Sequence, residues 1–285
     1  MPFYQMLVEA TFDRYRCFAS YGAWGGHVGE AIGKAVKAAQ LEGGKDVIVP
    51  EAIPDSLSRL SWSGRKRRLV GGAGVYIFGS RSCYTPDEVF LPPEGLIGSY
   101  GEEGAHDHLD VAPGFESYSE DGVHSVFVVV DRRQLEPVYA RLVASFPRLK
   151  VMWLRLSSEW DDVGEEAFFA NEAIDTPEAA LAFLRANRSD TIRNGLVSVT
   201  AYAEEGHTNI NLDAHKTLYV HTTNTAVQNR ACDLLRDFGL RETSPLLSLE
   251  IEYHHWHYRP ADSLCRSDFE GMLTRSGFKP WTPGR

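Results

Sequence analysis

Two segments of the chain alternate strand-like and helix-like stretches in the same order, and this alternation limits the fold more than any other feature. The elements predicted in the first segment are a β-branched strand at 124–131, a helix at 133–146, a strand at 150–160 and a helix at 176–187. The last helix has clear start signals, because Thr176 suits the N-cap and Pro177 suits the first helical position.

The second segment repeats this succession. Its predicted elements are a strand at 216–223, a helix at 225–239, a long strand at 245–258 and a helix at 267–277. The final helix carries a capping-box pattern, Ser267 with Glu270, and a glycine stop at Gly277.

We interpret the alternation as an internal duplication of a ferredoxin-like strand-helix-strand-helix unit, with repeats at about 123–190 and 213–285. The predicted fold class is α+β, with mixed sheets and helices packed mainly on one face. An N-terminal α+β region with long loops, 1–122, would precede the duplicated region, 123–285, and could be a diverged third copy. The alternative is that any chain of strands and helices produces such similarities by coincidence.

Composition narrows the classes of partner. The 285 residues are 43% hydrophobic and 24% charged with a net charge of −10, which is typical of a globular protein and opposes binding to nucleic acid or to anionic membranes. The basic cluster at 63–72 could contact phosphate, but it is most simply a solvated loop between domains. No apolar run reaches the length of a membrane span and no signal peptide is recognisable at the start, so we expect a cytoplasmic protein. The four cysteines are scattered, which predicts reduced thiols.

The stretch LEIEYHHWHYRP, 249–260, is the densest group of candidate metal ligands. On a strand, His255 and His257 would share one face and could chelate one ion, whereas Trp256 would lie on the other face. Zinc or non-haem iron needs at least one further protein ligand. The stretch is otherwise a packing or partner-facing strand.

Further ligands could come from GAHDHLD, 104–110. Its residues His106, His108 and Asp110 resemble the HxHxDH motif of metallo-β-lactamase-like hydrolases, although Val111 stands where that family has its last histidine. The resemblance implies a metal-dependent hydrolase or oxygenase holding Zn or Fe, and this is our alternative hypothesis. A third possibility, a nucleophilic triad, would use residues from His207, Asp213, His215 and His221, but no GxSxG or similar signature marks a nucleophile.

An acidic segment with aromatic residues lies between Arg155 and Arg185, where no basic residue occurs. The residues that we expect to contact a partner are Trp160, Asp161, Asp162, Glu165, Glu166 and Phe168, together with Trp256. Aromatic anchors supply buried contact area, and surrounding carboxylates attract a basic protein. A solvated acidic loop is the alternative.

The opening strand YQMLVEATF, followed by GEAIGKAVKAAQ and VIVPEA, is similar to the start of several small α+β families of bacterial immunity proteins, the antitoxins of polymorphic toxins. The similarity covers about 50 residues and identifies no functional residue. It implies a non-catalytic protein without a cofactor that neutralises a cognate toxin, or another basic protein, by direct binding. This is the function that we expect from the sequence.

Overall fold

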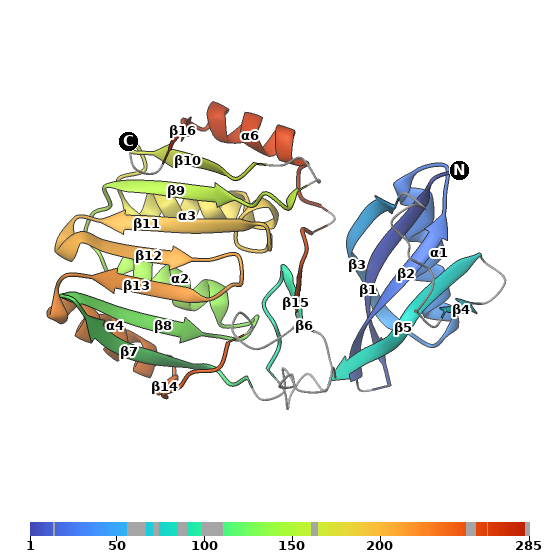
Figure 1. Ribbon diagram of the computed structural model, residues 1–285, viewed down its shortest axis with the longest axis horizontal. Coiled ribbons are helices and arrows are strands. Elements are labelled where there is room, and N and C mark those ends of the chain that lie inside the picture. The colour runs from blue at the N-terminus through green and yellow to red at the C-terminus, as the bar shows by residue number, and fades with distance from the viewer. Residues whose placement is uncertain are drawn as a thin grey trace. The chain divides into compact units, whose positions relative to one another are not determined.

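A computed structural model describes residues 1–13, 15–55, 67–70, 74–84, 90–98, 111–160, 165–248, 255–260 and 262–282. The chain divides into two compact units, Met1–Val89 (unit 1) and Phe90–Arg285 (unit 2) (Figure 1). The division lies earlier than the boundary predicted after residue 122. The reason is that strand β7 (Gly114–Glu120) pairs with β8 (Val123–Val129), and Leu96 packs against Phe127 of β8.

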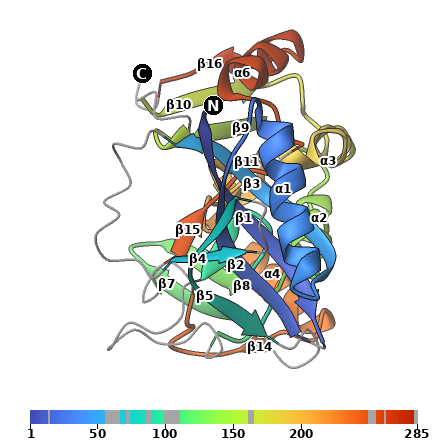
Figure 2. The same ribbon diagram turned by 90° about the vertical axis from the view of Figure 1, so that its right-hand side faces the viewer.

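In its described residues, unit 1 is a five-stranded antiparallel sheet with one helix on a face. Its elements are β1 (Phe3–Phe12), β2 (Tyr15–Trp24), α1 (Val28–Leu41), β3 (Lys45–Asp55), β4 (Arg67–Val70) and β5 (Val75–Tyr84), and the strand order is β3-β1-β2-β5-β4. Helix α1 buries an alanine face, including Ala31 and Ala35, against apolar residues such as Met6 and Tyr21. Figure 2 shows the length of α1. Strands β1 and β2 precede α1, and β3 follows it.

A disulfide joins two adjacent strands of unit 1. Cys17 of β2 and Cys83 of β5 are directly opposite in the register and are linked, whereas Cys232 and Cys265 are free thiols. The expectation of four reduced thiols is therefore wrong for this pair, because residues 66 apart in sequence become cross-strand neighbours.

Unit 2 is built on a nine-stranded sheet in the order β14-β7-β8-β13-β12-β11-β9-β10-β16. The remaining strands are β9 (Val151–Leu156), β10 (Ala167–Asn171), β11 (Val197–Ala203), β12 (Thr208–Leu212), β13 (Leu218–Thr222), β14 (Arg241–Glu242) and β16 (Lys279–Pro280), and a separate pair joins β6 (Leu96–Gly98) to β15 (His255–His257). The helices are α2 (Leu135–Ala144), α3 (Pro177–Ala186), α4 (Thr225–Asp237) and α6 (Arg266–Arg275), with short 3-10 turns at Arg188–Asp190 and Glu205–His207.

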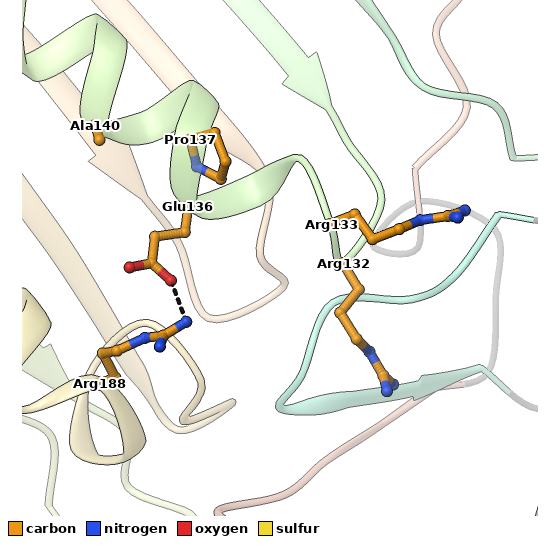
Figure 3. A pocket seen from close by; sticks show the side chains of 6 residues that line it. All are labelled: Arg132, Arg133, Glu136, Pro137, Ala140 and Arg188. Atoms are coloured by element: carbon orange, nitrogen blue, oxygen red, sulfur yellow. Dashed lines mark hydrogen bonds and ion pairs between the residues drawn. The ribbon is translucent and has the colours of Figure 1, made fainter.

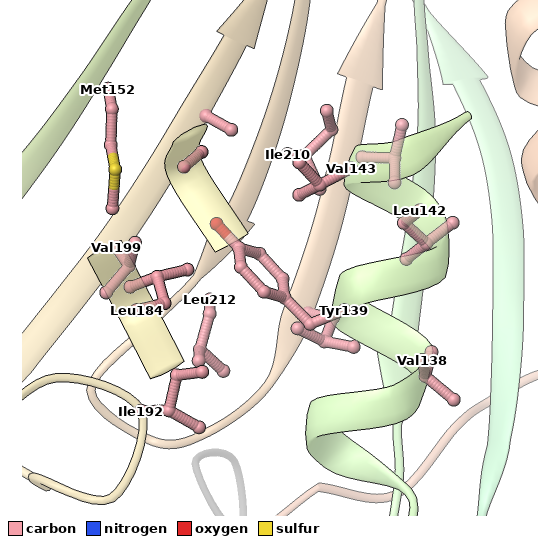
Figure 4. Close-up of a cluster of buried hydrophobic side chains, with 14 of the residues drawn as sticks. Val138, Tyr139, Leu142, Val143, Met152, Leu184, Ile192, Val199, Ile210 and Leu212 are labelled. Atoms are coloured by element: carbon pink, nitrogen blue, oxygen red, sulfur yellow. The ribbon is translucent and has the colours of Figure 1, made fainter. Parts of the chain in front are cut away.

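Helices α2, α3 and α4 cover one face of this sheet, and α6 lies at the β10 and β16 edge (Figure 1). Figure 4 shows Tyr139 and Leu142 of α2 among side chains such as Val199 and Ile210 of the strands, within the main core. We call the opposite face the outer face. At β8 it is covered by a second, smaller core that includes Phe90 and Leu246.

The coarse α+β prediction is confirmed, but the ferredoxin-like duplication is not. Strand β13 of the second predicted repeat pairs with β8 of the first, so both segments contribute to one sheet. The Thr176 cap is confirmed, since its side chain accepts the Ala179 N–H at 3.2 Å. The capping box is wrong: α6 begins at Arg266, and Glu270 forms an ion pair with Arg266 instead.

Within the described residues, no helix is both long enough and apolar enough to cross a membrane.

Candidate functional site

Three aromatic side chains meet on the outer face, where β9, β10 and β16 form one edge of the sheet. Trp153 alternates with buried core residues along β9, and Phe168 precedes the buried Phe169 on β10, so both point away from the helices. Trp281 follows β16 and donates its backbone N–H to the Phe168 carbonyl at 2.9 Å. The ring centroids of Trp153, Phe168 and Trp281 are 5.7 to 6.3 Å apart. We call these three residues the aromatic edge.

The aromatic edge is accessible from outside the protein. Trp281 is 41% exposed, and Trp153 and Phe168 are half-buried. Sequence reasoning identified Phe168 but missed Trp153 and Trp281, which lie on β9 and at the chain's end. The strand alternation around Trp153 was the signal that could have found it, because a tryptophan out of phase with Met152 and Leu154 must face outward.

Exposed carboxylates lie near Phe168 in the sequence. Glu159, Glu165 and Glu166 are exposed, and Arg155, which lies opposite Phe168 in the β9–β10 register, forms an ion pair with Glu166. The pair is solvent-exposed, so its net contribution to stability is at most about 1 kcal/mol. Arg155, and Lys279 of β16, which lies opposite Ala170 of β10 in the register, place basic groups at the same edge.

The negative charge of the chain belongs to unit 2. Residues 1–89 carry 11 basic and 9 acidic side chains, whereas residues 90–285 carry 18 basic and 30 acidic side chains. The aromatic edge therefore belongs to the strongly acidic unit, unit 2, whereas unit 1 is slightly basic.

Trp160 does not belong to the surface, which corrects its assignment as a partner-binding anchor. Its side chain is 0% exposed and stacks on Phe269 of α6, with ring centroids 5.6 Å apart. An apolar ring in a turn at the end of a strand packs inward when a helix covers it. The neighbouring predicted residues Asp161 and Asp162 lie outside the described residues.

Most of the predicted metal ligands also lie outside the described residues. His106, His108 and Asp110 lie outside the described residues, as do the side chains of His255 and Trp256 on β15. Of the predicted ligands, the structure describes the side chain of His257. Within the described part of the chain, no group of three or more His, Cys, Asp or Glu residues is arranged to hold a metal ion.

His257 lies next to a histidine from another part of the chain. The rings of His257 and His215 have centroids 4.8 Å apart and planes inclined by 73°. His257 Nδ1 is 2.5 Å from the Gly195 carbonyl oxygen, and His215 Nδ1 is 3.4 Å from Asp213 Oδ2. Asp213 also accepts the Thr217 N–H through Oδ1 at 2.9 Å, which fixes the carboxylate within the β12–β13 turn.

A buried lysine adjoins this pair. Lys216 is 2% exposed, and its ammonium group donates to the carbonyl oxygens of Asn194 and Val197 at 2.6 and 3.2 Å. Burial lowers the pKa of Lys216 to about 7, and the Asp213 carboxylate opposes this shift. Lys216 has a φ of 59°, a left-handed conformation that favours glycine, so its side chain has a structural role that outweighs the backbone cost.

The remaining histidines of the predicted triad have separate partners. His207 contacts the Tyr202 hydroxyl at 3.0 Å, and His221 contacts the Ser125 hydroxyl at 2.9 Å, where burial lowers the pKa of His221. Within that set, Asp213 and His215 lie in contact with each other.

A surface pocket of about 460 Å³ lies beside the start of α2 and is lined by Arg132, Arg133, Glu136, Pro137, Ala140 and Arg188. Figure 3 shows the guanidinium of Arg188 directed at Glu136, with Arg132 and Arg133 projecting elsewhere. Arg133 in turn pairs with Asp131 at 3.1 Å. The arginines do not converge on one point, so the pocket lacks the geometry of an anion site.

No protein-family model matches the chain, and no curated protein matches it significantly.

Proposed function

We propose that the protein is an acidic binding protein, an immunity protein that neutralises a basic toxin by direct contact with unit 2. The observation that carries the proposal is the aromatic edge, three mutually contacting rings on the outer face of the acidic unit. The toxin is the partner class that the resemblance of the N-terminal segment implies.

At a protein interface, buried aromatic rings and peripheral charges contribute to binding in different ways. Large aromatic rings near the centre supply most of the binding free energy once a partner excludes water from them. Peripheral charges contribute less affinity, but they raise the association rate and reject partners of the same sign. The outer face provides both, because Trp281 contacts Phe168, and Phe168 lies opposite Arg155, which pairs with Glu166.

The proposal modifies the set of contact residues expected from sequence. Phe168, Glu165 and Glu166 stay in the set, and Trp153 and Trp281 join it. Trp160 leaves the set because its buried ring supports α6 from inside.

The test is surface plasmon resonance between the full chain and the product of a toxin-like gene encoded beside its own. We expect Trp281→Ala to weaken binding by about 30-fold or more, which is the size of an interfacial hot spot. Tyr118→Ala is the matched control, because Tyr118 is a 47% exposed aromatic residue on β7, far along the strand order from β16. The control should bind like the wild type.

A second arm tests the charges. Glu165→Lys with Glu166→Lys should slow association and reduce its dependence on salt, whereas Glu120→Lys, at the exposed end of β7, should have a smaller effect. Absence of any complex with the toxin-like product would contradict the immunity function. A tight complex that is indifferent to Trp281→Ala would retain the function and reject the aromatic edge as its contact surface.

A further inference from the structure

We propose that the outer face of unit 2 binds a neutral oligosaccharide. The site is formed by four adjacent strands, β9, β11, β12 and β13, on the side of the sheet opposite α2 and α3 (Figure 1). The inference does not depend on the immunity function.

Four side chains form a first row across these strands. Alternate residues of each strand enter the core, for example Leu154 and Val199, so the residues between them point to the outer face. The outward residues that lie directly opposite one another are Trp153, Thr200, Asn211 and Tyr219. The row crosses three inter-strand spacings, or about 14 Å, which exceeds the width of one sugar ring. It therefore suits a chain of several sugars.

A second row lies beside the first, two residues further along each strand and about 7 Å away. Its members are Tyr202, Asn209 and His221, which are again directly opposite one another. We call the seven residues of the two rows the polar face. Thr200 is buried, and the other six are half-buried, so a ligand can reach them from outside.

Contacts with neighbouring side chains hold the polar groups in place. The Thr200 hydroxyl donates to Asn211 Oδ1 at 2.9 Å, which turns the NH2 group of this amide away from Thr200. In the second row, His221 Nδ1 lies 2.9 Å from Ser125 Oγ. Side chains that are fixed before binding lose less conformational entropy when a ligand arrives.

Aromatic rings lie at both ends of the first row. At one end, Trp153 contacts Trp281, with ring centroids 5.7 Å apart. At the other end, Tyr219 stacks on His221, with centroids 5.7 Å apart and planes inclined by 17°. The face of an aromatic ring is electron-rich, so it attracts the polarised C–H groups on the flat side of a sugar ring. The amide and hydroxyl groups thus lie between two surfaces on which sugars can stack.

The chemistry of the polar face favours an uncharged ligand. Lys, Glu, Arg and Asp are the usual residues of exposed positions, whereas these two rows carry amide, hydroxyl, imidazole and aromatic side chains. Burial lowers the pKa of His221, so its imidazole is uncharged at neutral pH.

These side chains match sugars better than other classes of ligand. A nucleic acid would need Lys or Arg for its phosphates, and an apolar ligand would leave the amides of Asn209 and Asn211 without partners. Acidic sugars would be repelled by unit 2, which carries 30 acidic and 18 basic residues. A neutral molecule with many hydroxyl groups can pair with the amides and stack on the rings.

The experiment is a glycan microarray probed with the fluorescently labelled full chain. The same surface carries neutral oligosaccharides, acidic oligosaccharides and single-stranded oligo(dT). We expect binding to one or more neutral oligosaccharides and to neither of the other classes. The neutral oligosaccharide that gives the strongest signal is then titrated, free in solution, by isothermal titration calorimetry.

Two variants test the polar face. Asn211→Asp should weaken binding at least about tenfold, because a carboxylate of the same shape cannot donate hydrogen bonds to the sugar. The Thr200 hydroxyl can still donate to the aspartate, so this variant should fold. Trp153→Ala should weaken binding to a similar extent through loss of a stacking surface. Tyr15→Ala is the control, because Tyr15 is a 39% exposed aromatic residue of unit 1, and it should bind like the wild type.

Asn211 does not belong to the aromatic edge, so Asn211→Asp tests the polar face separately from the proposed toxin contact. Three results would overturn the proposal. The first is that no neutral oligosaccharide binds, and the second is that acidic oligosaccharides or oligo(dT) bind more strongly. The third is a neutral ligand whose affinity is equal in the wild type, Asn211→Asp and Trp153→Ala.

Discussion

The indole of Trp160 lies stacked on the ring of Phe269, with planes inclined by 26°, and both side chains are 0% exposed. Phe269 belongs to α6 and Trp160 follows β9, so this contact holds the C-terminal helix against the sheet. Trp160, which was predicted from its acidic sequence segment to contact a partner, thus stabilises the core.

Trp160→Ala should therefore reduce the free energy of unfolding by about 3–5 kcal/mol, the usual loss for a large aromatic residue removed from a core. Trp281→Ala, at a 41% exposed site, should change it by less than about 1 kcal/mol. Urea unfolding followed by circular dichroism measures both. Equal losses in the two variants would contradict the assignment of one tryptophan to the core and the other to the surface.

The buried Lys216 should make stability depend on pH. Burial lowers its pKa to about 7 in the folded chain, whereas a lysine in an unfolded chain titrates near about 10.4. Between these values the unfolded chain binds the extra proton, so the free energy of unfolding should rise with pH, by up to about 1.4 kcal/mol per pH unit. Below about pH 7 Lys216 is protonated in both the folded and the unfolded chain, so the free energy of unfolding no longer changes with pH through this residue.

Urea midpoints measured at about pH 7.5 and about pH 9.5 test this dependence. Lys216→Met keeps the aliphatic stem at the same backbone position and removes the titrating amine. The wild type should gain more stability than this variant as the pH rises. Parallel pH profiles would contradict a depressed pKa at Lys216.

Gly206 should be intolerant of a side chain. Its φ is 64°, and a Cβ would lie 2.6 Å from Thr222 Oγ1 and 2.8 Å from Asn224 Cβ, the residue that caps α4. Gly239 also has a positive φ, 79°, but nothing lies within 4 Å of its Cβ position. Gly239→Ala should lower the free energy of unfolding by about 1–2 kcal/mol, because of the left-handed backbone alone. Gly206→Ala should lower it by about 1–3 kcal/mol more, because of the clash. Similar melting temperatures for the two variants would argue against the clash.

The disulfide should stabilise unit 1 selectively. Closing a loop between residues 66 apart corresponds to about 4 kcal/mol in the chain-entropy model. Reduction should therefore increase hydrogen exchange in β2 and β5, as measured by mass spectrometry, with little change in β9 or β11. The Cys17→Ser, Cys83→Ser double variant should show the same exchange with and without reductant. Cys265→Ser, which removes a free thiol, should respond to reductant like the wild type.

Local patterns in the sequence predicted local structure well. The helix that begins after Thr176 and the strands around Val126 and Leu154 follow from spacing and cap residues, because these signals act within a few residues. The order of the strands in the sheet could not be predicted from these local patterns. The pairing of β8 with β13 joins residues about 90 positions apart, and a period of two along each strand says nothing of which strand is its neighbour.

The candidate sites show the same limit. Phe168 was identified from its acidic surroundings, but its contact with Trp281 depends on the pairing of β10 with β16. His257 was predicted as a candidate metal ligand from its spacing to His255. Its neighbour in space is His215, which the sequence analysis grouped with His207 and His221. Composition and spacing find reactive residue types, whereas their partners are set by tertiary packing.

The unequal distribution of charge between the two units has a consequence for encounters in solution. Unit 2 carries 30 acidic and 18 basic residues, and unit 1 carries 9 and 11. A positively charged body therefore attracts unit 2 and weakly repels unit 1. This difference selects the acidic unit for the encounter before any side chains touch, over distances of about one Debye length.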